Sequence, residues 1–292
     1  MTSSSYRLPS DWPLATTLLA GAIISGLILF FVCAFVIWES SNAIIEIGFR
    51  PFVFDQAWSP TSGFYGMVPM FVASLLAMLG SVIIAAPISF GAALFLSFAS
   101  ARKTAICLRR IIELMAGIPS VVYGLWGLVV LVPIINQWHA PGTSLLAAIL
   151  ILSIMILPMI ALTADAAFQS IPRHQLAASR ALGVGFRGML ELVIWPFTRI
   201  GIYSGVLLAA ARALGETMAV LLVSGNIPQI PHSIFDPIRT LTTNMAIEMA
   251  YAMGRHRSAL FVSGCAIVLL VLSLVLFADW LKSRSEKVLV SR

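Results

Sequence analysis

Six apolar segments, each about 20 residues long or longer, constrain the fold of this chain more than any other feature. They cover residues 14–38, 67–98, 111–135, 145–163, 201–225 and 258–281. An α-helix needs about 20 mostly apolar residues to cross the roughly 30 Å hydrocarbon core of a bilayer. None of the segments shows the alternating pattern of a membrane β-strand. The sequence therefore predicts an all-α, polytopic membrane protein with six transmembrane helices.

The composition agrees with a membrane protein and argues against other classes. Only 10% of the 292 residues are charged, 60% are hydrophobic, and the mean hydropathy is +0.98, whereas a soluble domain has about 25% charged residues. The net charge of +6 would suggest nucleic acid in a soluble protein, but we expect no nucleic-acid partner here. The three cysteines and four histidines have no metal-ligand spacing, so we expect no metal and no cofactor.

The positions of Lys and Arg predict the orientation of the spans. Residues 1–13, 99–110, 164–200 and 282–292 together hold thirteen Lys and Arg, against four in the segments on the opposite side. Cytoplasmic loops carry the excess of positive charge, so both termini are predicted to be cytoplasmic. The first apolar segment is longer than the core of a signal peptide and has no small-residue cleavage site, so we expect a retained helix.

The largest predicted cytoplasmic loop, residues 164–200, contains a helix–glycine–helix pattern. Ser170 and Pro172 suit a helix start, Gly183 suits its end, and a second short helix is expected to run to Pro196. The first helix is more apolar than a solvated loop requires. It could rest on lipid headgroups or dock a cytoplasmic partner. The residues that a partner would contact are Gln175, Ala177, Ala178, Ser179, Leu182 and Gly183.

Two ionisable residues lie inside the fifth apolar segment, Arg212 and Glu216. A charged side chain at bilayer depth costs at least about 2.5–3.5 kcal/mol on insertion scales. In a helix the two residues lie one turn apart on the same face, so we expect an ion pair. It could lock helix packing, or an anionic substrate could compete for the guanidinium, whose planar fork matches two oxygen atoms of an oxyanion.

Further candidate residues of a substrate pathway lie near this pair and in the third segment. Thr217 offers a hydroxyl, although a Thr in such a helix more often bonds to its own backbone. Pro119 is expected to kink the third helix and, with Ser120, to line a pore or to serve packing alone. Glu113 is expected to pair with Arg109. No H-E-x-x-H or intramembrane Ser/His pair supports an intramembrane enzyme.

Two outer segments are expected to be large enough to dock a partner. Residues 39–66 contain Trp58 and several turn-forming residues. In residues 226–257, Asp236 and Pro237 suit the start of a helix that Gly254 would end. No phosphate-binding loop of the G-x-x-x-x-G-K-[ST] type is present, so any ATP hydrolysis would occur in another chain.

Three stretches and the cytoplasmic loop resemble a known family. The loop is similar to the EAA loop of ABC-importer permeases, with Gly183 and Pro196 in place and Ala177 where the family has Glu. The stretches AGIPSVVYGLWGLVVLVP (116–133), ARALGETMAVLLVSGN (211–226) and FDPIRTLTTNMAIEMA (235–250) resemble the PstC-type permeases of phosphate-specific importers. A permease for another oxyanion, such as sulfate, molybdate or phosphonate, is the alternative.

The resemblance implies a type I permease arrangement and an assembly of several chains. The expected partners are a second permease (PstA-like), a dimer of an ATPase subunit (PstB-like) and an extracytoplasmic phosphate-binding protein (PstS-like), in a bacterial inner membrane with its lipid. Phosphate would then pass by alternating access. We expect three regions: an N-terminal helix and outer loop (1–66), the permease core (67–281) and a cytoplasmic tail (282–292).

Overall fold

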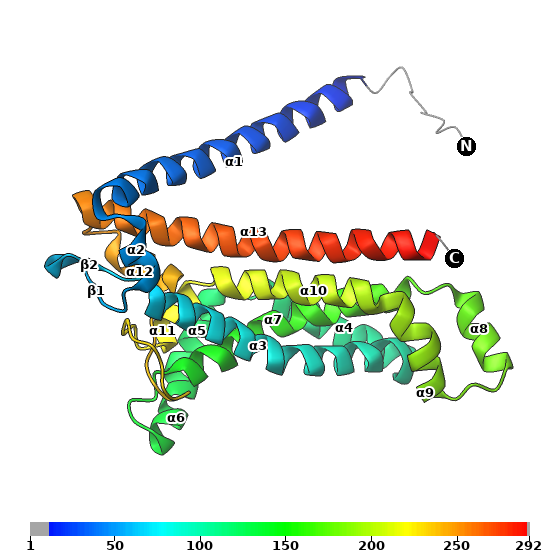
Figure 1. Cartoon of the computed structure of the whole chain (residues 1–292). Helices are drawn as coiled ribbons and strands as arrows, with labels where there is room; N and C mark the ends of the chain where they lie inside the picture. The colour runs from blue at the N-terminus through cyan, green and yellow to red at the C-terminus, as the bar shows by residue number, and fades with distance from the viewer. Residues whose placement is uncertain (1–11, 291–292) are drawn as a thin grey trace.

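A computed structural model describes residues 12–290 of the chain, and the side chains of residues 14–280. Six helical segments in this part are long and apolar enough to cross a membrane, which confirms the predicted number of spans. They are Leu14–Ile47, Val68–Ala99, Ser120–Trp138, Leu145–Gln169, Phe186–Gly215 and Gly254–Trp280. The helices run roughly along one long axis (Figure 1).

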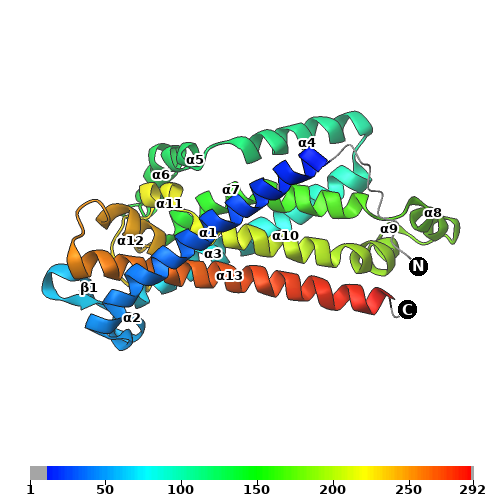
Figure 2. The same ribbon diagram turned by 90° about the horizontal axis from the view of Figure 1, so that it is seen from above.

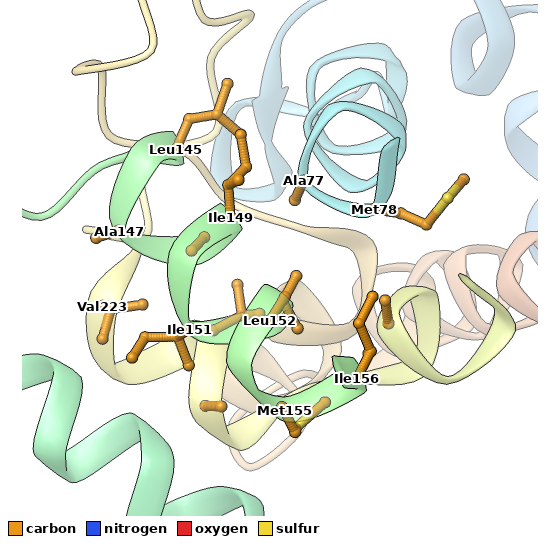
Figure 3. Packing of buried hydrophobic residues seen from close by; sticks show 14 of the residues in the cluster. Ala77, Met78, Leu145, Ala147, Ile149, Ile151, Leu152, Met155, Ile156 and Val223 are labelled. Carbon is orange, nitrogen blue, oxygen red and sulfur yellow. The ribbon is translucent and has the colours of Figure 1, made fainter. Parts of the chain in front are cut away.

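The core of the bundle is built around α7 (Leu145–Gln169), the most buried of these helices. It packs against α3 (Val68–Leu94), which the π-helical turn η2 (Phe95–Ala99) extends, and against α10 (Trp195–Gly215). Figure 3 shows Ala77 of α3 near Ile149 of α7. Small residues on α3 and α10 let the backbones approach closely; a methyl group at Gly205 would overlap Thr163.

Two long helices lie at the side of this core. α13 (Gly254–Val290) packs along α10, whereas α1 (Trp12–Ile47) contacts α13 near one end and diverges from it toward the other (Figures 1 and 2). The contact includes the ring pair Phe35–Phe261 and an ion pair of 2.7 Å between Glu46 and Arg255. Most side chains of α1 therefore remain exposed in the isolated chain.

One end of the bundle carries short elements, most of which contribute to a second apolar cluster. They are α2 (Phe49–Phe54), β1 (Trp58–Ser59), η1 (Pro60–Ser62), β2 (Phe64–Tyr65) and α12 (Leu241–Glu248). β1 and β2 form an antiparallel hairpin, and Trp58 and Tyr65 pack edge to face. We call this the outer end, after the predicted orientation.

The predicted helix start at Asp236 and Pro237 is wrong. α12 begins at Leu241, after Thr240, whose hydroxyl accepts a hydrogen bond from the Thr243 amide. The carboxylate of Asp236 instead accepts from the amides of His232 and Ser233 at 2.8 and 2.9 Å. These donors lower the pKa of Asp236 from its ordinary value of 3.8. Asp236 therefore closes a turn, because its side chain satisfies two loop amides.

The opposite end carries the helix–glycine pattern that the sequence predicts. α8 (Arg173–Ala181) ends before Gly183, which has a φ of +71°, and it projects beyond the bundle (Figure 2). The predicted second short helix is not separate. α9 (Phe186–Met189), the π-helical turn η4 (Leu190–Ile194) and α10 are continuous, so the fifth span begins at 186 and not at 201.

Candidate functional site

Two helices are interrupted inside the apolar region, where the sequence predicts one kink and one intact helix. α4 (Arg102–Gly117) ends before Ile118 and Pro119, and α5 (Ser120–Trp126) then continues through η3 (Gly127–Leu131) into α6 (Val132–Trp138). α10 ends at Gly215, and α11 (Met218–Val223) begins after two intervening residues, Glu216 and Thr217. The backbone is extended at Pro119 (ψ 140°) and at Glu216 (ψ 130°).

The hydroxyl of Tyr123 compensates for the first interruption. A proline has no amide hydrogen, so Pro119 cannot donate to the carbonyl of Met115 as a helical residue would. The Tyr123 hydroxyl donates to this carbonyl at 2.8 Å. The same carbonyl also accepts from the amide of Ile118 at 3.3 Å, so two donors bind it, which stabilises a full break where the sequence predicts only a kink.

The two interruptions lie at the same level because α5 and α11 run side by side. A methyl group at Gly124 would lie 2.7 Å from the Cα of Ala219, and one at Gly127 would lie 2.9 Å from a side-chain carbon of Val223. The helices therefore run parallel with their backbones in close contact. One turn before Gly124, Ser120 lies at the level of Glu216, so the structure brings these two predicted pathway residues to one depth.

The second break lies near the middle of the bundle. Gly205 of α10 faces Thr163 of α7, and the Val223 carbonyl accepts from the amide of Ser144 at 3.1 Å. α10 and α11 thus run antiparallel to α7. Arg212, about halfway between Gly205 and Val223, therefore lies level with the middle of α7.

The predicted ion pair between Arg212 and Glu216 is wrong. Because the helix ends at Gly215, Glu216 is no longer one helical turn from Arg212, and its Oε1 accepts from the amide of Ala219 at 3.3 Å. The guanidinium of Arg212 is exposed and has no hydrogen bond or ion pair with any other residue that the structure describes.

The other predicted pathway residues border the same breaks. Thr217 is half-buried, and its hydroxyl donates to the carbonyl of Gly215 at 3.3 Å and not to a carbonyl one helical turn back. Pro119 is exposed and Ser120 is half-buried. The chain thus presents a cation, a carboxylate and two hydroxyls around two helix breaks.

Sequence reasoning missed a hydrogen bond that joins the outer end to this region. The hydroxyl of Thr242, at the start of α12, donates to the carbonyl of Glu216 at 2.9 Å. No periodic signal connects two residues that are so far apart in the chain.

Sequence reasoning also missed two ion pairs with buried carboxylates, one at each end of the bundle. Asp165 binds Arg109 at 2.8 Å, so the predicted pairing of Arg109 with Glu113 is wrong. At the outer end, Glu248 binds Arg239 at 2.7 Å and accepts from the indole of Trp58 at 2.9 Å. Both carboxylates are buried, and each joins elements that are distant in sequence.

The residues predicted to contact a cytoplasmic partner lie in and just after α8. Ala177, Ala178, Leu182 and Gly183 are exposed, and Leu182 retains 81% of its surface. Gln175 is half-buried. Ser179 faces inward and is buried, with its hydroxyl bonded to the Leu176 carbonyl at 3.0 Å. Ser179 therefore lies on the inner face of α8 and is not part of its exposed surface.

Residues 85–287 match the family described as binding-protein-dependent transport system inner membrane component. The chain belongs to this permease family. The permease is 31% identical to the phosphate transport system permease protein PstC of Pasteurella multocida, over 91% of this chain and 89% of that protein. It is 33% identical to the PstC protein of Mesorhizobium japonicum, over 91% and 88% of the two chains.

Solved structures share the arrangement of the helices. The permease superposes on a chain of a bacterial alginate ABC transporter with a TM-score of 0.64 at 16% identity, covering 94% of this chain and 95% of that one. A chain of the inward-facing MetNI methionine ABC transporter gives 0.60 at 17% identity, over 78% and 99%. The fold is thus that of an ABC-importer permease.

Proposed function

We propose that this chain is the permease subunit of an ATP-driven importer that moves inorganic phosphate into the cytoplasm across a bacterial inner membrane by alternating access. The PstC relatives of similar length support phosphate over sulfate, molybdate or phosphonate. The residues proposed for the pathway are Arg212, Glu216, Thr217, Ser120 and Pro119.

The unpaired guanidinium of Arg212 carries this proposal. A permanent charge near the middle of the bundle needs a counter-charge or a polar passage, and within the described part of the chain none is bonded to it. Phosphate supplies both the negative charge and the paired oxygens that the guanidinium fork recognises. Alternating-access sites form near the membrane midplane, often at interrupted helices. Arg212 lies three residues before such an interruption.

Partner chains would complete the pathway and drive it. The exposed surfaces of α4, α5 and α10 around the breaks fit a second, PstA-like permease that closes the passage. The exposed side chains of α8, with Leu182 foremost, fit an ATPase subunit of a PstB-like dimer, which would hydrolyse ATP. The excess of Lys and Arg at this end supports a cytoplasmic position for it. A PstS-like phosphate-binding protein would then dock on the outer end.

Phosphate uptake by variants of Arg212 tests the proposal. Arg212→Ala removes two charge-assisted hydrogen bonds, each worth about 1.5–3 kcal/mol, so the transport rate should fall at least about 100-fold. Arg212→Lys keeps the charge but loses the fork, and we expect a loss of about tenfold. The assay uses the complete importer in proteoliposomes, with radiolabelled phosphate and with sulfate or molybdate as competitors.

A matched control and a contrary outcome make this test decisive. Arg110 is also exposed and has no bonded partner in the described part of the chain, but it lies in the middle of α4, about two helical turns before the break. Arg110→Ala should transport normally. Wild-type uptake by a normally assembled Arg212→Ala importer would refute the role of Arg212, and equal competition by sulfate would refute phosphate selectivity.

A further inference from the structure

The break between α10 and α11 separates two residues that an intact helix would bring together. In a continuous helix through residues 195–223, Glu216 would lie one turn after Arg212 on the same face, where opposite charges attract. The Glu216 carbonyl would then accept from the amide of Val220. In the structure the ψ of 130° at Glu216 directs that carbonyl elsewhere. The broken and continuous forms therefore differ in whether Arg212 is free or paired.

The hydroxyl of Thr242 binds the Glu216 carbonyl, whose direction differs between the broken and the continuous form. Its 2.9 Å hydrogen bond engages the Glu216 carbonyl, so Thr242 can bind this oxygen only while the helix stays broken. Glu216 adds a second bond of the broken form, because its side chain accepts from the Ala219 amide. Both bonds would be lost if the helix became continuous.

The outer end holds Thr242 in place. Its hydroxyl lies 3.0 Å from that of Thr240, and the hydroxyl of Thr243 donates to the Thr240 carbonyl at 3.0 Å. The neighbouring amide of Leu241 donates to Ser74 of α3 at 3.0 Å. Thr242 is 9% exposed. A donor fixed in this way loses little conformational freedom when it binds the carbonyl.

We propose that Thr242 is a positioning residue for phosphate passage: its hydroxyl holds the 216–217 break open and thereby keeps Arg212 from pairing with Glu216. This inference rests on the proposed function for its link to phosphate. The hydroxyl touches the backbone of the break, so Thr242 acts through Glu216 and Arg212. The helical spacing of Arg212 and Glu216 favours an ion pair between them, and the hydrogen bond from Thr242 disfavours it.

Amide hydrogen exchange of the complete importer in lipid nanodiscs tests the effect on the backbone. In Thr242→Val the break should rewind, and a peptide covering residues 213–221 should exchange about five- to tenfold more slowly, as expected for one hydrogen bond. Thr242→Ser keeps the donor and should match the wild type. The control Thr198→Val removes a buried hydroxyl of α10 that bonds to the Ile194 carbonyl at 2.8 Å. It should leave the exchange rate of this peptide unchanged.

Phosphate uptake then tests the consequence for Arg212. Thr242→Val should reduce the maximal rate several-fold, and Thr242→Ser should restore it. In a Glu216→Gln background, where no ion pair can form, Thr242→Val should cost less than it does in the wild type. Should the valine variant fail to assemble, Thr242→Ala removes the same donor without adding bulk.

Unchanged or faster exchange at 213–221 in the assembled valine or alanine variant would overturn the inference. Equal losses in the two Glu216 backgrounds would overturn the pairing argument. These outcomes are separate from those of the proposed function. If Arg212→Ala transports phosphate normally, the function of Arg212 fails, while hydrogen exchange still decides what Thr242 does to the helix.

Discussion

Replacing Arg109 by Met should destabilise the permease more than replacing Asp165 by Asn, although each change breaks the same ion pair. The Asp165 side chain is 4% exposed and that of Arg109 is 32% exposed. Asp165 accepts from Arg109 at 2.9 and 3.1 Å, from Ser97 at 2.7 Å and from Gln169 at 2.8 Å. The carboxylate therefore cannot reach water when its partner is lost, whereas the guanidinium can.

The sizes of the two effects follow from this asymmetry. Arg109→Met leaves a buried carboxylate with two neutral donors, and losing one partner of a buried pair costs about 3–5 kcal/mol. Asp165→Asn removes the charge but keeps an acceptor for Ser97, so about 1–3 kcal/mol is expected. At about 2–4 °C per kcal/mol for a larger domain, the melting temperature should fall by about 10 °C and about 5 °C.

Thermal unfolding of the purified importer in detergent, followed by tryptophan fluorescence, measures both values. Arg110→Met is the control, since it removes an exposed neighbouring Arg. The double variant Arg109→Met with Asp165→Leu should be more stable than Arg109→Met alone, because no buried charge remains. A larger loss for Asp165→Asn than for Arg109→Met, or additive losses in the double variant, would refute the reasoning.

Two further predictions concern packing and assembly. Gly124→Ala should lower the melting temperature, because the added methyl meets the Ala219 backbone and overpacking costs about 1–3 kcal/mol. The control Gly91→Ala adds a methyl with no neighbouring atom within 4 Å, so it should leave the melting temperature unchanged. Equal stability of the two variants would contradict this prediction. Leu182→Ala should leave the melting temperature of the purified permease unchanged, because its side chain is 81% exposed, while reducing co-purification of the ATPase; full recovery of the ATPase would argue against docking through α8.

The number of spans could be predicted because hydropathy over about 20 residues is a local quantity. The end of α8 was predictable for the same reason: Gly183 has the positive φ that the pattern requires. The break after Gly215 was not predictable. The spacing of Arg212 and Glu216 is helical, and the bond that opposes it comes from Thr242, in another element.

The predictions of ion pairs failed for the same reason. A local rule favours Arg109 with Glu113, but burial between helices favours Asp165, which lies on α7 and receives several donors there. The residues around the helix breaks could be singled out one by one, since ionisable and proline residues stand out in an apolar segment. The partners of these residues depend on how the helices pack in three dimensions, and local sequence patterns do not specify this packing.

The contact of Gly124 with Ala219 has a mechanical consequence. Where two helices touch backbone to backbone, no flexible side chain lies between them to absorb a displacement. A displacement of α11 should therefore displace α5 by a similar amount. We therefore expect the two segments at the helix breaks to shift together when the permease changes conformation.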